Sequence, residues 1–238
     1  MMTFAKLRIG VLGLVFSLEP LAAFAQPVDR RVASIGELQR QARLRHAQEL
    51  LGSHYKKSAV RSGEKVTKIN RLVYGWVRNH LPKSYRAHYQ TVAQAIIDEA
   101  ARNEFDPVLL MAVIQGESGF NPRMRGALDE VGLMQIRPRT AAWIIGKMGL
   151  KIKFEGEKTL LDPVQNIRIG AAYLSYLREK FESHARLYLA AFNMGPRNVD
   201  HALNQRIWPR DYPNHVMKYY LGFYSRLGSI TLASHKAP

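Results

Sequence analysis

The chain contains no cysteine among its 238 residues. This absence excludes disulfide bonds, cysteine-ligated zinc and thiol nucleophiles, so the core has to be stable without covalent cross-links. It also excludes a lipid attached to cysteine, and we therefore expect that the protein is not a lipoprotein.

Acidic residues are scarce, because 19 Asp and Glu stand against 35 Lys and Arg. The formal net charge of +16 indicates a polyanionic partner, which could be a cell-wall polymer, anionic lipid head groups or nucleic acid. Nucleic acid is not expected as a partner, since charge alone supports it and the N-terminus predicts export. A soluble protein that is basic without such a partner is the remaining interpretation.

Long apolar runs are lacking too, although apolar residues make up 47% of the chain. The run at residues 9–18 is too short to span a bilayer, which needs ~20 residues. It follows a basic start and precedes residues 23–25, an Ala-Phe-Ala sequence of the cleavage-site type. We therefore expect residues 1–25 to be a secretory signal peptide, in preference to a membrane anchor or a buried helix. The mature chain would begin at Gln26, be periplasmic or secreted, and contain no transmembrane segment.

The mature chain divides into two parts of unequal charge. Residues 26–90 contain fourteen Lys and Arg against four Asp and Glu, whereas residues 91–238 contain nineteen against fourteen. We call residues 26–90 the basic extension. It could bind an anionic surface or a partner protein, or it could be a helical extension that packs on the main domain. Trp76 and Tyr74 favour packing, because large aromatic side chains gain most from burial.

Two helices are expected in the basic extension. The first apolar set has roughly helical spacing and ends before Gly52: Ile35, Leu38, Ala42, Ala47, Leu50 and Leu51. The second set has the spacing of an amphipathic helix and stops before Pro82: Ile69, Leu72, Val73, Trp76 and Val77. The extension is therefore predicted to be helical.

Residues 91–238 also have a helical pattern, so the predicted fold class is mainly α. A helix is expected over residues 91–105, and Asp106 followed by Pro107 is a favoured start for the next helix. Residues 108–114 are apolar without a break, so that helix should be buried; a strand is the rival, but alternation is lacking. Further helices are expected over residues 138–148, 163–181, 184–192, 196–203 and 213–227.

Glu117 closely follows the buried apolar run. The partial negative charge at a helix C-terminus and apolar surroundings both disfavour ionisation of a carboxyl group, so both raise its pKa. A carboxylic acid that keeps its proton near neutral pH can donate it to a glycosidic oxygen. On position alone, however, an exposed glutamate at a helix end is the better explanation.

Five short motifs begin with this residue and follow one another along the chain. They are Glu117-Ser118-Gly119-Phe120-Asn121-Pro122, Gly132-Leu133-Met134-Gln135, Pro138-Arg139-Thr140-Ala141, Asp162-Pro163 with Asn166-Ile167 and Gly170, and Ala191-Phe192-Asn193-Met194-Gly195-Pro196. Over roughly residues 92–203 the chain resembles the soluble lytic transglycosylase family of the lysozyme-like superfamily, with goose-type lysozyme as a relative. The resemblance implies a lysozyme-like helical domain over residues 91–238, with a short β-hairpin at the cleft.

The resemblance also implies roles for individual residues. Glu117 resembles the family's single catalytic acid and base. Substrate binding is implied for Ser118, Met134, Gln135, Phe192 and Asn193. Ser118 could instead bond nearby backbone groups at the helix end, and the Gln135 amide can both donate to and accept from sugar groups. Gly132 is expected to be structural.

The sequence departs from the family pattern at three places. Phe192 stands where the family has tyrosine, so a hydrogen bond near Glu117 is missing or supplied by another group. Gly126 stands where the family has serine, which puts a polar contact there in doubt. Asp129 and Glu130 replace a Gly-Ala pair, and we expect them to form a solvated turn rather than to take part in catalysis.

The resemblance implies a lytic transglycosylase that cleaves peptidoglycan glycan strands between MurNAc and GlcNAc and leaves a 1,6-anhydro end. A lysozyme-type hydrolase and a non-catalytic wall-binding or assembly protein are the alternatives, and the intact Glu117 argues against the second of these. No metal or cofactor is expected, because the eight histidines show no metal-ligand spacing. The protein is expected to be a monomer.

Overall fold

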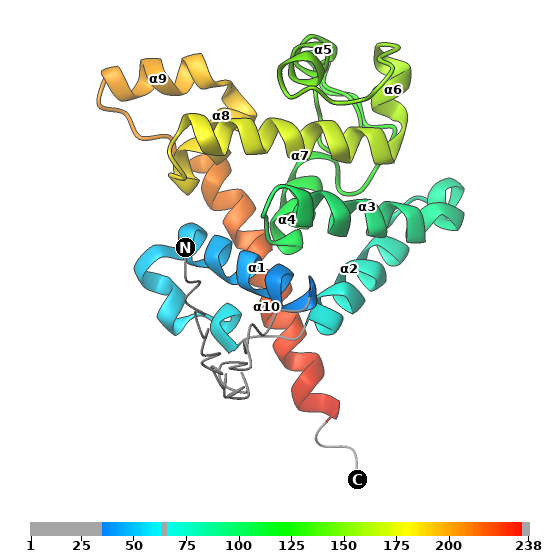
Figure 1. The fold of residues 1–238 in the computed structure, drawn as a ribbon, viewed down its shortest axis with the longest axis vertical. Helices are drawn as coiled ribbons and strands as arrows, with labels where there is room; N and C mark the ends of the chain where they lie inside the picture. The colour runs from blue at the N-terminus through cyan, green and yellow to red at the C-terminus, as the bar shows by residue number, and fades with distance from the viewer. Residues whose placement is uncertain (1–34, 63–65, 235–238) are drawn as a thin grey trace, which may run out of the picture. The chain divides into compact units, whose positions relative to one another are not determined.

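The computed structural model describes residues 35–62 and 66–234 (Figure 1). All of them belong to one compact unit. The predicted signal peptide, residues 1–25, and the start of the basic extension, residues 26–34, lie outside the described residues, so export stays a prediction. Among the described residues, no helix has both the length and the apolar character that crossing a membrane requires.

The described residues are mainly helical, which confirms the predicted fold class (Figure 1). The helices are α1 (Ile35–Leu51), α2 (Val66–His80), α3 (Tyr89–Arg102), α4 (Pro107–Ser118), α5 (Pro138–Lys147), α6 (Glu157–Leu161), α7 (Pro163–Lys180), α8 (Ala185–Met194), α9 (Pro196–Asn204) and α10 (Asp211–Ser234). Three short 3-10 helices accompany them: η1 (Gly52–Lys57), η2 (Ala59–Ser62) and η3 (Lys83–His88). The sequence predicts all of these α-helices except the five-residue α6.

Two helices begin with the same aspartate–proline pair. Asp106 accepts a hydrogen bond from the backbone N of Val108 at 3.0 Å, and a proline is the first residue of α4. Asp162 accepts a hydrogen bond from the backbone N of Val164 at 2.8 Å, and a proline again begins α7. In both helices the carboxylate satisfies a backbone donor that the first helical turn leaves free.

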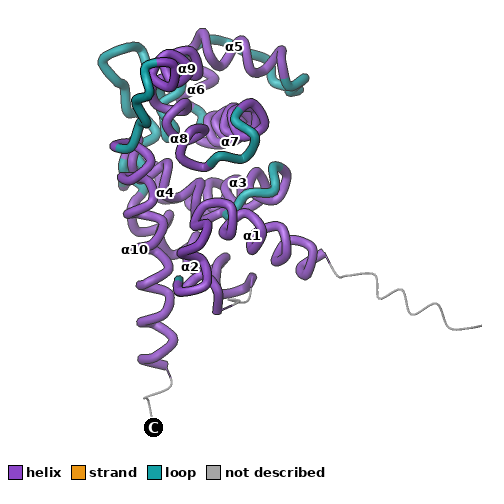
Figure 2. The backbone as a smooth tube through the Cα atoms, turned by 90° about the vertical axis from the view of Figure 1, so that its left-hand side faces the viewer, coloured by secondary structure: helices purple, strands orange, loops and turns teal. Residues whose placement is uncertain are grey.

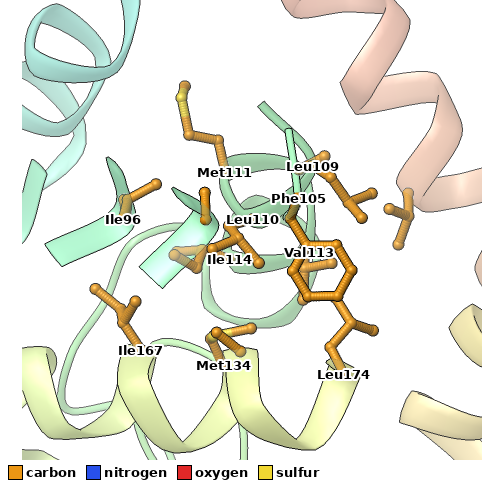
Figure 3. Close-up of a cluster of buried hydrophobic side chains, with 14 of the residues drawn as sticks. Ile96, Phe105, Leu109, Leu110, Met111, Val113, Ile114, Met134, Ile167 and Leu174 are labelled. Carbon is orange, nitrogen blue, oxygen red and sulfur yellow. The ribbon is translucent and has the colours of Figure 1, made fainter. Parts of the chain in front are cut away.

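Helix α4 lies at the centre of the core. Its residues 108–114 are all fully buried, which confirms the prediction from the unbroken apolar run. Helix α4 packs against α2, α3 and α10, and Figure 2 shows the long α10 beside it. In Figure 3, side chains of α4 form one cluster with Ile96 of α3 and with Ile167 and Leu174 of α7. This packing fixes the direction of α4, and Glu117 lies at its end.

The two helices of the basic extension pack on later parts of the chain. Helix α2 packs against α3 and α4, and α1 packs against α8. Trp76 of α2 donates a hydrogen bond to the Gln115 side chain of α4 at 3.2 Å and lies edge-on against Phe223 of α10. These contacts favour a packed extension, whereas the domain boundary at residue 90 stays a prediction.

A buried polar network connects α1 to the start of α4. Nδ1 of His46 accepts a hydrogen bond from the backbone N of Asp106 at 3.0 Å, so the neutral ring carries its hydrogen on Nε2. That nitrogen lies 3.1 Å from the hydroxyl of Tyr188. Complete burial and the nearby Arg178 guanidinium lower the pKa of His46 well below its usual value, so the ring stays neutral.

The carboxylate of Asp106 is also the acceptor for two tyrosines of α10. The hydroxyls of Tyr220 and Tyr224 donate to its Oδ2 at 2.8 and 2.6 Å. Arg43 of α1 in turn donates to the Tyr224 hydroxyl at 2.9 Å. The network therefore ties α1 and α10 to the N-terminus of α4, the helix whose other end carries Glu117.

Candidate active site

Glu117 is the penultimate residue of α4. The helix ends at Ser118, and Gly119 follows in the left-handed region with a φ of 58°. Glycine adopts this conformation without the steric strain that a Cβ atom causes. Phe120 is fully buried directly after the turn and anchors the chain there. The turn leaves the Glu117 side chain partly exposed at the helix end.

Within the described part of the chain, the Glu117 carboxyl group has one hydrogen-bond partner. The hydroxyl of Tyr212, near the start of α10, donates to Oε1 of Glu117 at 2.5 Å. Burial and the negative charge of Glu117 raise the pKa of Tyr212 well above its usual value, so this hydroxyl keeps its proton. Tyr212 is therefore the hydrogen-bond donor that orients the Glu117 carboxyl group.

Burial raises the pKa of Glu117 to about 7. The hydrogen bond from Tyr212 acts in the opposite direction because it stabilises the carboxylate, and the negative charge of Glu130 adds to the increase. A carboxyl group with this pKa exists in both protonation states at neutral pH, so it can lose and regain a proton during one reaction. The increase through burial agrees with the prediction from the sequence.

A short β-hairpin is predicted at the cleft, and the structure does not confirm it. We call residues 119–137, between α4 and α5, the cleft loop. In this loop the described chain has only isolated antiparallel bridges, from Val131 to Arg125 and to Ile136. The backbone N of each of Val131 and Ile136 donates to the other's carbonyl oxygen at 3.1 Å. Residues 132–135 form the turn between these two bridged residues, with positive φ values at Gly132 and Gln135, and the pairing does not extend beyond the single bridges.

Asn166 of α7 holds this turn from inside the core. It is fully buried, its Nδ2 donates to two backbone carbonyls at 2.8 and 2.9 Å, and its Oδ1 accepts from the backbone N of Met134 at 2.7 Å. A side chain on Gly132 would collide with Asn166, and a side chain on Gly170 would collide with Met134. These motif residues therefore fix the position of the turn.

Ser118 and Met134, two of the predicted substrate-binding residues, are buried and have their side chains turned to other parts of the protein. The hydroxyl of Ser118 lies 2.8 Å from the carbonyl oxygen of Leu133 and 3.2 Å from that of Ile114. Its single hydrogen thus bonds nearby backbone, which leaves only its lone pairs for a ligand. The Met134 side chain is fully buried in the core (Figure 3), so only its backbone could contact a substrate.

The other three predicted residues line one cavity of about 420 Å³, which we call the first hollow: Gln135, Phe192 and Asn193. The amide NH₂ of Gln135 donates to two backbone carbonyls of the cleft loop at 3.1 and 2.8 Å, so its amide oxygen is available to a ligand. Asn193 is exposed in the last turn of α8, while the ring of Phe192 is buried against Tyr173. Among the described residues, no cluster of His, Asp and Glu side chains could hold a metal ion.

Asp129 and Glu130 have different surroundings, although the sequence predicts a solvated turn for both. Asp129 is exposed, as expected. The Glu130 side chain is only 21% exposed, and its carboxylate pairs with Arg137 at 2.7 Å. Glu130 lines the first hollow and is near enough to Glu117 to raise its pKa, whereas Glu117 itself does not line that hollow. The Glu130 side chain is therefore partly solvated and paired with Arg137, and its expected lack of a catalytic role stays a prediction.

Two departures from the family pattern, Gly126 and Glu130, are sterically complementary. A side chain at Gly126 would collide with the carboxylate of Glu130, so the glycine leaves room for the carboxylate. The third departure, Phe192, has no hydroxyl, yet Glu117 receives a hydrogen bond from Tyr212.

The sequence predicted neither the hydrogen bond from Tyr212 to Glu117 nor the position of Glu130 near Glu117. Tyr212 lies 95 positions after Glu117 and outside every motif that supports the resemblance. Its sequence context, Asp-Tyr-Pro, indicates a helix start but not the direction in which the tyrosine points. Such a contact depends on how α10 packs against α4, which no spacing in the sequence reveals.

Comparison with known proteins identifies a protein family whose model matches this chain. The family model described as the transglycosylase SLT domain matches residues 94–214. The soluble lytic murein transglycosylase of Escherichia coli strain K12 is 30% identical over 131 residues, which cover 55% of this chain and 20% of that protein. Membrane-bound lytic murein transglycosylase C of Photorhabdus laumondii is 34% identical over 130 residues, which cover 52% of this chain and 35% of that protein.

A solved structure shares the fold. It is an inactive mutant of the lytic transglycosylase Slt from Pseudomonas aeruginosa, with a TM-score of 0.51 and 22% sequence identity over 77% of this chain and 37% of that chain. The match thus spans only 20% to 37% of the length of these three proteins.

Proposed function

The chain belongs to the transglycosylase SLT domain family, and we propose that it is a lytic transglycosylase acting on peptidoglycan. It cleaves the β-1,4 bond between MurNAc and GlcNAc and leaves a 1,6-anhydro-MurNAc end. The observation that carries this proposal is a single carboxyl group, Glu117, with a pKa of about 7, oriented by Tyr212 at the end of a buried helix.

In the first step, protonated Glu117 donates its proton to the glycosidic oxygen. The bond between that oxygen and C1 of MurNAc breaks, and GlcNAc leaves with a hydroxyl group. Positive charge develops at C1, and the substrate's own acetamido group stabilises it. Tyr212 stabilises the carboxylate that Glu117 becomes, because its hydroxyl already donates to Oε1.

In the second step, the same carboxylate acts as a base. It takes the proton from the C6 hydroxyl of MurNAc, and the C6 oxygen forms a bond to C1. Glu117 is then protonated again, and no water is consumed. A pKa of about 7 suits both steps, since neither protonation state of Glu117 is strongly disfavoured at neutral pH.

Neutral polar groups bind the sugar on this account. The free amide oxygen of Gln135 and the exposed amide of Asn193 accept from and donate to hydroxyl and acetamido groups along the first hollow. Ser118 acts mainly by fixing the cleft loop to the end of α4. Phe192 forms an apolar wall.

A lysozyme-type hydrolase is the second candidate, and Glu130 is the observation that favours it. A hydrolase with two carboxylates needs a second Asp or Glu across the bond as base or nucleophile. Glu130 is a carboxylate close to Glu117, but its pairing with Arg137 makes it a weak base. A non-catalytic wall-binding protein is disfavoured, because it has no need of a glutamate with a raised pKa.

The proposal extends to the place of action. Peptidoglycan lies outside the cytoplasm, so the proposed substrate and the predicted signal peptide are consistent with each other. We propose a monomeric, exported enzyme without a lipid anchor, metal or cofactor. The basic extension is proposed to contact the anionic wall with those cations that remain exposed.

Replacing Glu117 tests the proposal. Glu117→Gln keeps the size of the side chain but cannot transfer a proton, so cleavage of purified peptidoglycan should fall by at least ~10²–10⁴-fold. Binding to sedimented wall and the melting temperature should stay near wild-type values. The matched control is Glu179→Gln, an exposed glutamate of α7, which should keep full activity. A Glu117→Gln protein with wild-type activity would rule out the proposed role.

A further inference from the structure

The turn between α9 and α10, residues 206–210, exposes two large apolar side chains in succession. Ile207 is 56% exposed and Trp208 is 53% exposed. Apolar residues exposed singly are ordinary on a protein surface, whereas two neighbours on one turn form a contiguous apolar tip. The turn lies at the margin of the molecule (Figure 1), and neither residue lines the first hollow or the cavity of about 810 Å³ beside it. The proposed catalysis therefore does not account for their exposure.

The backbone holds this turn in one conformation. The backbone N of Ile207 donates to the carbonyl oxygen of Ala202 at 2.8 Å, which ends α9 in a Schellman motif. Arg206 has a φ of 60°, a left-handed conformation that glycine adopts with less strain. Pro209 fixes its own φ and restricts the backbone of Trp208 before it. The apolar tip is thus presented to solvent by an ordered and partly strained turn.

Cations flank the apolar tip on both sides. Arg206 precedes it and Arg210 follows it, and both are exposed. Within the residues that the structure describes, neither arginine forms an ion pair with an acidic side chain. Asp211 is the only acidic residue between positions 201 and 218. Two guanidinium groups without acidic partners favour an anionic surface.

We infer that this turn binds the protein to an anionic phospholipid surface. Ile207 and Trp208 enter the boundary between head groups and acyl chains, where tryptophan is favoured because one part of its ring is apolar and its N–H stays hydrated. Arg206 and Arg210 bind the lipid phosphates. A second protein fits less well, because a stable protein interface takes roughly 20–30 residues from each side and the tip offers two.

Membrane binding through this turn brings the candidate active site close to the bilayer. Tyr212, which donates to Glu117, follows Trp208 by four positions, and four residues span at most about 14 Å. The inference goes beyond the proposed function and does not depend on it, since lipid binding requires no cleavage.

Co-sedimentation with vesicles of phosphatidylglycerol and phosphatidylethanolamine tests the inference. The protein is used without the predicted signal peptide, whose apolar run would itself bind lipid. Ile207→Ser/Trp208→Ser should lower the partition coefficient roughly ten-fold, because two half-exposed apolar side chains lose their burial. Arg206→Gln/Arg210→Gln should lower it roughly five-fold per arginine, and this loss should disappear at high salt. All four residues are exposed, so both variants should fold normally.

Two matched controls separate the turn from the rest of the surface. Leu38→Ser removes a similarly exposed apolar side chain from α1 and should bind vesicles like wild type. Arg71→Gln/Arg86→Gln removes two exposed cations from the basic extension and should weaken binding less than the arginine variant of the turn. A larger loss in the extension variant would assign lipid binding to the extension and overturn the inference.

Tryptophan fluorescence shows directly whether the tip enters the bilayer. Vesicles with brominated acyl chains should quench the wild-type fluorescence, and this quenching should be lost in Trp208→Phe. Trp143→Phe, at the other tryptophan with an exposed side chain, should be quenched like wild type. Quenching that persists in Trp208→Phe, or a wild-type protein that does not bind the vesicles, overturns the inference.

Sedimentation with purified peptidoglycan distinguishes lipid from the other anionic polymer. Ile207→Ser/Trp208→Ser should keep wild-type binding to the wall while it loses binding to vesicles. Loss of wall binding with unchanged vesicle binding would make the turn a glycan surface and contradict the inference. A protein that binds vesicles through the turn but cleaves no peptidoglycan would contradict the proposed function alone.

Discussion

Two neighbours of Glu117 act on its pKa in opposite directions. The hydroxyl of Tyr212 donates to the carboxylate and lowers the pKa, whereas the negative charge of Glu130 raises it. As a general acid Glu117 has to be protonated, so activity should fall as the pH rises through its pKa of about 7. Removing either neighbour should therefore move this alkaline limb in a direction that can be stated in advance.

Tyr212→Phe removes the hydrogen bond to Glu117 and keeps the ring. The pKa of Glu117 should rise, so the alkaline limb of the pH–rate profile should move to higher pH. The maximal rate should fall roughly ten-fold, because the carboxyl group is less well oriented. Tyr219→Phe, on the same helix and without a bond to Glu117, is the control and should change neither quantity. An unshifted limb in Tyr212→Phe would contradict this explanation of the pKa.

Glu130→Gln removes a negative charge near Glu117. The pKa of Glu117 should fall, so the alkaline limb should move to lower pH and the rate above neutral pH should drop roughly two- to five-fold, with little change at acidic pH. Asp129→Asn, at the exposed neighbouring position, should be nearly silent. A Glu130→Gln enzyme that is inactive at every pH would instead indicate a second catalytic carboxylate and support the hydrolase.

At the scale of residues, the sequence predicts those features that depend on neighbouring positions in the chain. The position of Glu117 after an unbroken apolar run indicates the direction of its pKa shift, but on position alone an exposed glutamate was the better explanation, and only the motifs that follow it identified the residue. The burial of Met134 and the hydrogen bond from Tyr212 depend instead on how α7 and α10 pack. Those contacts join positions far apart in the chain, so they were not predictable from one sequence.

The stability of helix α4 depends on the hydrogen bonds that Asp106 makes at its first turn. Asp106 caps this turn and also accepts from Tyr220 and Tyr224, which are buried. Asp162 caps α7 in the same way, but it is exposed. The two aspartates therefore separate the effect of capping from that of the buried network.

Asp106→Ala should lower the free energy of unfolding by roughly 3–5 kcal/mol, because it removes a cap and leaves buried hydroxyl donors without an acceptor. Asp162→Ala should cost only about 1 kcal/mol, the usual value for a cap. Denaturation in urea measures both. Equal losses in the two variants would mean that the network around Asp106 adds nothing to stability.

At the scale of elements, helix starts were the most predictable features. The Asp-Pro pairs at residues 106 and 162 predict where α4 and α7 begin, because capping is local chemistry. The five-residue α6 has no such start signal and was missed. The predicted hairpin was not confirmed, since the cleft loop is held by Asn166 from α7 rather than by a ladder of its own.

The charge of the whole molecule is divided unevenly, and the extension that carries most of it also contributes to the fold. Helices α1 and α2 bring Arg43, His46 and Trp76 into contact with α4, α8 and α10. The sequence alone left open whether the extension packs or binds a polyanion. Packing is now evident, and binding of the anionic wall stays a prediction.

The product of cleavage tests the central claim most directly. Purified peptidoglycan is digested in water enriched in heavy oxygen, and the released muropeptides are analysed by mass spectrometry, with Glu117→Gln as the blank. If Glu117 acts as both acid and base, the products end in 1,6-anhydro-MurNAc, are lighter by one water than hydrolysed fragments, and contain no heavy oxygen. Products that end in reducing MurNAc and carry heavy oxygen at C1 would contradict the account and identify a hydrolase.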